Sequence, residues 1–334
     1  MVDYNVFMQV LKEKLLDYMP MDFKGYSAGI RREMDVNGVA DILTVAPPGE
    51  QEMYMIPEMK VGDLYEIYRC NDDLAEILAY AGENYAKEYG DNMKVRDSIM
   101  EGKADDYVVM KLINTAANEE MLKDMPHREF HDLSVVYQWM VSVDMVFDRF
   151  VTINNNVAGM LGITEQELFE AGSRNTRKAK PPTIETLASV CGAAGMDFPA
   201  EPGCSAEYLN SLPKQVKEET MWLISNTSHN GGAASMLYED VLHNLADFLG
   251  DDLYIMPVSV NEVIAVPVGG EEREYLSEML AESNSCLTRV CDRLSNDIYM
   301  YDRKIREVKM ATDVKDKRLT KPELPEPVMA GLAR

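Results

Sequence analysis

Cysteine, histidine and tryptophan are scarce in this chain of 334 residues, which has five Cys, four His and two Trp. The cysteines form no Cys-x-x-Cys pair, and an odd number leaves one over from any pairing. Isolated thiols of this kind are typical of a protein in a reducing compartment. The sequence therefore indicates neither a disulfide framework nor a cysteine-based metal site.

Long apolar runs are also missing. No stretch of about 18 uncharged apolar residues is present, so a membrane-spanning helix is not expected. The first residues interleave Asp, Lys and Glu with apolar positions, unlike the basic start and unbroken apolar stretch of a secretory signal. We therefore expect a cytoplasmic protein.

Several motifs that hold phosphates or metals are absent. The chain contains neither G-x-x-x-x-G-K-[ST] nor G-x-G-x-x-G. The segment "HREFH" (127–131) has Glu129 two residues after the first His, about 200° away around a helix, whereas a zinc protease needs Glu directly after it. We therefore expect no metal and no cofactor, and we assign no residue a catalytic role.

Positive charge is in short supply, since 33 Lys and Arg face 57 Asp and Glu, for a net charge of −24. Such a chain repels phosphate backbones and anionic lipids, so general nucleic-acid binding and membrane binding are disfavoured. Solubility is the favoured explanation of this acidity. The alternative explanation is a surface that mimics DNA. Residues 303–334 are locally basic and rich in proline, and we predict that this tail is mostly disordered.

Hydrophobic periodicity predicts the organisation of the first third of the chain. Apolar residues at helical spacing over 3–18 predict an opening helix. Asn37-Gly38 is typical of a hairpin turn, because both positions tolerate positive φ. Residues 61–89 predict helix, interrupted near Asn71 and ended by Gly90. Residues 1–104 thus form an expected helix–hairpin–helix region.

Two later blocks each predict the order strand, helix, strand, strand, helix, which indicates an α+β fold. We place the lobes at 105–172 and 217–302, with 173–216 as a linker or insertion that includes a helix from Thr183. An interval of 113 residues separates Val108 from Met221 and also Phe150 from Val263. An internal duplication is one explanation, and two unrelated helix-covered sheets are the other.

Four segments carry a resemblance to a known family: "PHREFHDLSVVYQ", "GITEQELFEAG", "ISNTSHNGGAASMLYEDVLHNLADFLGDDLYIMPVSVNEVIAVP" and "LSNDIYMYDR". Over about residues 107–302, and more loosely before them, the chain resembles an uncharacterised bacterial family known only as a domain of unknown function. Asn261 stands where the family's "HEV" pattern has His. The resemblance implies a shared fold, includes the 225–235 loop in the family's pattern, and brings no established activity.

The loop "SNTSHNGGAAS" (225–235) is the candidate binding site. A glycine-rich entry into a helix offers free N–H groups and a positive dipole end to an anion. The candidate ligand-binding residues are Asn226, His229, Asn230, Gly231, Gly232 and, more distant in sequence, Glu262. The alternative is a plain strand-to-helix turn, in which Asn230-Gly231 supplies positive φ and Gly232 permits close packing.

Two further patterns have both a functional and a structural explanation. Ser225, Ser228 or Ser235 with His229 and Glu262 imitates a catalytic triad, which only geometry can establish. Five tyrosines recur along 61–89, as in a protein interface or, more commonly, at the rim of a core.

A non-catalytic cytoplasmic binding protein with unidentified protein partners is the favoured function, and the oligomeric state is open. The alternatives are an enzyme or small-ligand binder that uses the 225–235 loop, and an acidic nucleic-acid mimic that inhibits a DNA- or RNA-processing enzyme.

Overall fold

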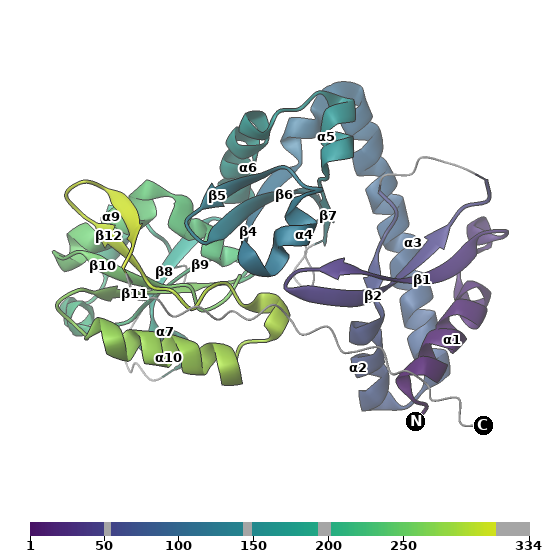
Figure 1. Ribbon diagram of the computed structural model, residues 1–334, viewed down its shortest axis with the longest axis horizontal. Helices are drawn as coiled ribbons and strands as arrows, with labels where there is room; N and C mark the ends of the chain where they lie inside the picture. The colour runs from purple at the N-terminus through teal and green to yellow at the C-terminus, as the bar shows by residue number, and fades with distance from the viewer. Residues whose placement is uncertain (50–54, 143–148, 193–201, 312–334) are drawn as a thin grey trace, which may run out of the picture.

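The computed structural model of the chain describes residues 1–49, 55–142, 149–192 and 202–311. The N-terminal region lies at one end of the long axis, a first sheet lies in the middle, and a second sheet lies at the other end (Figure 1). Every described strand pairing is antiparallel. The α+β class is confirmed.

The N-terminal region packs helices against a three-stranded sheet in the order β1-β2-β3. Its strands are β1 (Ser27–Asp35), β2 (Gly38–Ala46) and β3 (Met59–Lys60), and its helices are α1 (Tyr4–Lys14), α2 (Val61–Asn71) and α3 (Leu74–Ser98). Phe7 and Leu11 of α1 and Leu43 of β2 are fully buried in its core. The apolar positions that predicted α1 are therefore those that hold it to the sheet.

The hairpin turn lies one residue earlier than predicted. Asp35 pairs with Gly38, so the turn residues are Val36 and Asn37, and Asn37 alone has positive φ (60°). Asparagine tolerates this left-handed conformation better than valine does. Gly38 begins β2 instead of completing the turn.

The helical break near Asn71 is confirmed, and the end at Gly90 is wrong. Asp72 has φ of 53° after α2, and the Asp73 side chain caps the first turn of α3. α3 then continues through Gly90 to Ser98, because Val95 and Ile99 beyond the glycine pack into the core of the next region.

Most of the tyrosine face of 61–89 belongs to the core. Tyr68 and Tyr85 are buried, whereas Tyr80 is 39% exposed. The Tyr85 hydroxyl accepts a hydrogen bond from the N–H of Val45 (2.7 Å) and donates one to the carbonyl of Pro57 (2.9 Å). These contacts join α3 to the sheet.

The first sheet is built around β6, which pairs with β4 on one side and with β5 and β7 on the other. Its strands are β4 (Val108–Asn114), β5 (His127–Phe130), β6 (Leu133–Ser142) and β7 (Arg149–Thr152), and its helical segments are η5 (Ala116–Asn118), α4 (Glu119–Leu122), α5 (Asn155–Leu161) and α6 (Glu165–Ala179). A capping box formed by Thr164 and Glu167 starts α6.

The second sheet has six strands in the order β13-β12-β10-β11-β9-β8. They are β8 (Pro182–Thr186), β9 (Trp222–Asn226), β10 (Leu253–Met256), β11 (Val263–Pro267), β12 (Tyr299–Asp302) and β13 (Glu307–Met310). The accompanying helical segments are α7 (Leu187–Val190), α8 (Ala206–Ser211), η6 (Lys214–Glu218), η7 (Gly232–Leu237), α9 (Glu239–Leu249), α10 (Arg273–Cys286) and η8 (Val290–Asp292). Figure 1 shows α9 and α10 on opposite faces of this sheet.

Two predictions for connecting segments are wrong in part, because the expected helix is helical only at α7 and the expected tail is described only over 303–311. The helix from Thr183 is instead strand β8, whose β-branched Thr183, Ile184 and Thr186 pair with β9. The tail is ordered up to Ala311: Asp302 Oδ1 accepts the N–H groups of Lys304 and Ile305, which closes the turn between β12 and β13. Residues 312–334 of the predicted tail lie outside the described residues.

One hydrophobic core joins the two sheets. It contains Trp139 of β6, Leu168 of α6, Trp222 of β9 and Val241 of α9. Three consecutive strands of each sheet lie in the order first, third, second, as β4-β6-β5 and β9-β11-β10, while β7, β8, β12 and β13 stand outside this pattern. By position in the sheet, β6 corresponds to β11. By the interval of 113 residues between Phe150 and Val263, β7 corresponds to β11. The duplication therefore stays a prediction.

Candidate functional site

The 225–235 loop connects β9 to η7, and its hydrogen bonds are largely internal. The buried Asn226 side chain donates to the carbonyl of Asn230 (3.0 Å) and accepts the N–H of Ser228 (3.0 Å). Ser228 Oγ also donates to Asn226 Oδ1 (3.0 Å). Asn226 thus holds the shape of the loop.

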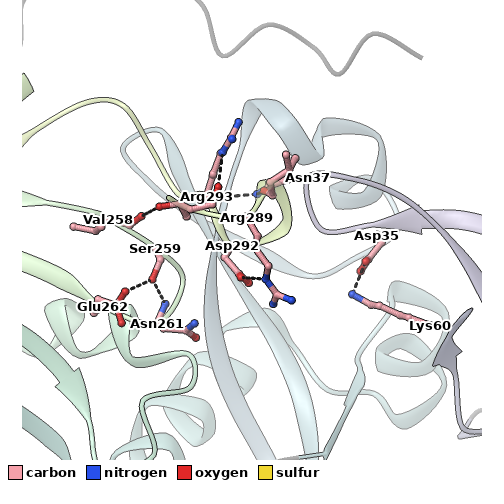
Figure 2. Close-up of polar contacts among 12 residues, drawn as sticks. Asp35, Asn37, Lys60, Val258, Ser259, Asn261, Glu262, Arg289, Asp292 and Arg293 are labelled. Atoms are coloured by element: carbon pink, nitrogen blue, oxygen red, sulfur yellow. Dashed lines mark hydrogen bonds and ion pairs between the residues drawn. The ribbon is translucent and has the colours of Figure 1, made fainter. Parts of the chain in front are cut away.

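Gly231 and Gly232 bring the loop against the segment 259–262. The Gly231 N–H donates to Asn261 Oδ1 (3.0 Å), at a φ of 66° that favours glycine. A Cβ on Gly232 would lie 2.4 Å from the carbonyl oxygen of Asn261. The carboxylate of Glu262 accepts the hydroxyl of Ser259 (2.7 Å), as Figure 2 shows.

The predicted residues therefore separate into two groups. Asn226, Gly231 and Gly232 lie together, with Glu262 just behind them. His229 is exposed on the outside of the loop with φ of 51°. Among the described residues, its imidazole forms no hydrogen bond with a serine of the loop. The hydroxyls of Ser225 and Ser235 donate to the carbonyls of Asn261 and Ser225 (both 2.7 Å). This arrangement does not form a triad.

A larger cleft lies between the N-terminal region and the first sheet, with a volume of about 610 Å³. Side chains alternate between the two faces of a strand. Lys111 and Ile113 of β4 and Gln138 of β6 therefore line the floor of the cleft. Their neighbours Leu112 and Tyr137 face the shared core. Its other walls come from the β1–β2 hairpin, residues 56–60, α3 and the turn at 289–292. We call this cavity the central cleft.

Buried amides fix the hairpin beside the cleft. The N–H of Asn37 donates to Asn118 Oδ1 (2.7 Å), and Asn118 Nδ2 donates back to Asn37 Oδ1 (2.7 Å). Asn37 Nδ2 donates to the carbonyls of Val290 (2.8 Å) and Arg293 (2.7 Å), on the turn drawn in Figure 2. All three parts of the chain meet here, so the walls of the cleft have a fixed relative position.

Charged side chains in the cleft differ in their pairing. Lys60 forms an ion pair with Asp35 (2.5 Å), and Arg289 forms one with Asp292 (2.8 Å), as seen in Figure 2. Lys111, by contrast, has no hydrogen-bond or ion-pair partner among the described residues. Burial, and after it the ammonium group of Lys60, lowers the pKa of Lys111.

Acceptors gather on the α3 side of the cleft. Desolvation raises the pKa of Glu88, Arg149 opposes this rise, and the neighbouring Asp91 and Glu58 add to it. Desolvation likewise raises the pKa of Glu58, with Glu33 adding to the rise and Arg31 opposing it. Asn92 is fully buried beside them, and its Oδ1 has no hydrogen-bond partner among the described residues. The cleft therefore combines one unpaired amine with several unpaired acceptors.

The 225–235 loop borders the central cleft. A small cavity of about 80 Å³ is lined by Asn230 and Gly231 of the loop and by Lys180. It shares Lys111, Gln138 and Phe150 with the wall of the central cleft. The loop predicted from the sequence and the cleft that it did not reveal are thus neighbours.

The remaining candidates are weaker. A wider depression of about 990 Å³ is more open, and its Arg273 and Glu274 are paired with each other (2.8 Å). "HREFH" forms β5, with His127 and His131 contacting different carbonyls. Sequence reasoning overlooked that Gly25–Gly29 has the G-x-S-x-G pattern, but Ser27 starts edge strand β1 instead of a strand-to-helix turn.

Two kinds of feature are absent from the residues that the structure describes. Within them, no group of three or more His, Cys, Asp or Glu side chains is placed to hold a metal ion. Within the same residues, no helix combines the length and apolar character that crossing a membrane requires.

The comparisons with known proteins agree with the resemblance seen in the sequence. Neither a curated protein nor a solved structure matches the chain. The pattern of a family of unknown function, DUF5688, matches residues 4–303, which is most of the chain. The chain belongs to this family.

Proposed function

We propose that this protein is a non-catalytic binding protein whose central cleft receives a ligand. The observation that carries the proposal is the unpaired Lys111 in the floor of a cleft of about 610 Å³. Cavities of roughly 300–1,000 Å³ are typical of small-ligand sites. A charged group without a partner costs folding stability, so a bound partner gives a reason for its presence.

The 225–235 loop takes part at the edge of the site in this proposal. Asn230 and Gly231 line the adjoining small cavity, while Asn226, Gly232 and Glu262 hold the loop in shape through the contacts described above. A protein partner fits the cleft when it inserts one side chain or one chain end, because the volume holds no more than a few residues. The unpaired state of all five cysteines supports a cytoplasmic location.

Thermal unfolding of the full chain tests this function. The probes are amino acids, short amines, nucleotides, inorganic phosphate, Mg²⁺ and lysine- or arginine-containing tripeptides. A compound that binds only the native state, present at 100 times its Kd, stabilises it by about 2.7 kcal/mol and raises the midpoint. We expect at least one such compound.

A variant that blocks the cleft makes the test specific. Gln138→Trp places an indole in the wall shared by both cavities and should abolish the shift. Glu129→Trp, at an exposed position of β5 in the same sheet, is the matched control and should retain it. Equal shifts in both variants, or no shift with any probe, would contradict binding in the cleft.

A further inference from the structure

The inner face of α3 carries an unused acceptor in the wall of the central cleft. Asn92 is fully buried and lines the cleft. Its Nδ2 donates to the carbonyl of Met55 (2.9 Å), but its Oδ1 accepts no hydrogen bond from any described residue. Buried amide oxygens in folded proteins almost always have a donor. The Oδ1 atom of Asn92 therefore keeps its capacity to accept a hydrogen bond.

Two carboxyl groups stand beside this acceptor. Glu88 lies one helical turn before Asn92, so both side chains share a face of α3, and Glu58 reaches the same wall from the segment before β3. Neither glutamate has a hydrogen bond or ion pair among the described residues. Arg149 is the cation near Glu88, but its guanidinium binds Asp91 (3.0 Å).

We infer that Glu58, Glu88 and Asn92 hold an organic cation, an ammonium or guanidinium group, at one end of the ligand. Such a group carries several N–H donors and a positive charge, which matches three acceptors and two negative charges. Charge-assisted hydrogen bonds of this kind are stronger than neutral ones. The inference rests on the proposed function, because it names the chemistry of the ligand that the central cleft receives.

The three acceptors are graded from the inside of the cleft to its mouth. Asn92 is buried, Glu88 is half-buried and Glu58 is exposed. A cation on a narrow aliphatic stem can therefore enter past Glu58 and be desolvated against Glu88 and Asn92. Both a free amine and a lysine or arginine side chain of a polypeptide have this form.

Calorimetric titration of the full chain tests the inference with defined probes. They are n-butylamine, n-butylguanidine and the capped tripeptides Gly-Lys-Gly and Gly-Arg-Gly, with n-pentanol as an uncharged control. We expect at least one cation to bind at millimolar concentration or better and n-pentanol not to bind. Binding of the small cations alone identifies a free amine as the ligand, and tighter binding of the tripeptides identifies a polypeptide side chain.

Matched variants connect the binding to the named residues. Glu88→Gln keeps the shape and removes the charge, and it should weaken cation binding roughly tenfold or more. Glu58→Gln, at the mouth, should weaken it less. Glu83→Gln on the exposed side of the same helix should leave it unchanged. Failure of all four cations to bind, or binding unaffected by Glu88→Gln, would overturn the inference.

The failure of the inference can be told apart from the failure of the proposed function. A neutral or anionic compound that binds the native chain and Glu88→Gln equally, but does not bind Gln138→Trp, would keep the cleft as a binding site and remove the cation from it. If cation binding persisted in Gln138→Trp but were lost in Glu88→Gln, the cation site on α3 would be supported. The proposal that the whole central cleft receives the ligand would be contradicted.

Discussion

The 225–235 loop and the central cleft are both polar, but their polar groups have different partners. In the loop, Asn226 uses both ends of its side chain within five residues, and Gly231 bonds to Asn261. In the cleft, Lys111, Glu88 and Asn92 Oδ1 have no partner among the described residues. Since unpaired buried polar groups cost stability, the cleft is where a ligand has the most to add.

The buried junction around Asn37 extends this comparison. It lies next to the cleft, which Val36 lines, and both ends of the Asn37 side chain and its N–H are hydrogen-bonded. A fully paired polar network specifies one arrangement of the parts that it joins. The same residue type is therefore fully paired at position 37 and keeps an unpaired Oδ1 at position 92.

Gly232→Ala should cause the largest loss of stability and tests whether the loop is closely packed. In Gly232→Ala the new methyl carbon would lie 2.3 Å from Ser225 Oγ and 2.4 Å from the carbonyl oxygen of Asn261. The backbone must shift, so we expect a loss of about 3 kcal/mol or more in the free energy of unfolding. Urea denaturation measures this loss.

Gly90→Ala is the control for this prediction. A Cβ at position 90 meets nothing within 4 Å, and alanine in a helix raises stability by up to about 1 kcal/mol over glycine. If Gly232→Ala were as well tolerated as Gly90→Ala, the loop would not be the closely packed turn that the structure shows.

Asn37→Ala should give the next largest effect. It removes the donors to the carbonyls of Val290 and Arg293 and the acceptor of Asn118, and it places alanine at a φ of 60°. We expect a loss of about 3 kcal/mol in the free energy of unfolding, again measured with urea. Asn210→Ala, at an exposed position of helix α8, should show almost no loss. Equal stability of the two variants would mean that the junction does not hold the cleft together.

Glu88→Gln should have a smaller effect of the opposite sign. The pKa of Glu88 is raised in the folded state, chiefly by burial, so the folded state binds the proton more tightly than the unfolded chain. Stability then falls as pH rises from the ordinary glutamate pKa of about 4.3 to the raised value. Above that window, Glu88→Gln should unfold roughly 1–3 °C higher than the native chain.

The pH dependence distinguishes this explanation from a general packing effect. The difference in midpoint between Glu88→Gln and the native chain should grow with pH through the window and then stay constant. Arg149, Asp91 and Glu58 also face Glu88, so Glu83→Gln serves as the control for charge removal elsewhere on α3. A difference that is constant from acid to neutral pH would exclude a titrating Glu88.

Local patterns predicted the elements whose signals are local. The Thr164-x-x-Glu167 pattern forms the capping box that starts α6, and the apolar runs at 107–114 and 252–259 contain β4 and β10. Strand β8 and the β12–β13 hairpin were missed, because their conformation depends on pairing with strands far away in the sequence. The continuation of α3 beyond Gly90 likewise depends on the core that it meets.

The candidate site was harder to predict than the fold. Glycines and asparagines at 225–235 indicated a ligand loop, but residue types do not show which side chains pair with each other. The central cleft draws its walls from hairpin, helix, sheet and turn residues more than 200 positions apart, which only the tertiary structure brings together. One local signal was present: Lys111 interrupts an otherwise apolar buried strand, where a charge needs an explanation.

The smallest expected effect is a change in the pH at which the Lys111 amine becomes reactive. It tests directly whether Lys111 is unpaired. Its pKa is lowered by burial and by Lys60, so its reactive neutral amine should appear at lower pH than that of an ordinary lysine. Lys103 is the control, since its ion pair with Glu101 (3.0 Å) raises its pKa. Trace acetylation across a pH series, read by mass spectrometry of each peptide, should place the midpoint of Lys111 below that of Lys103. Coincident midpoints would mean that Lys111 is as well compensated as a paired surface lysine, and the contrast between cleft and loop would then rest on Glu88 and Asn92 alone.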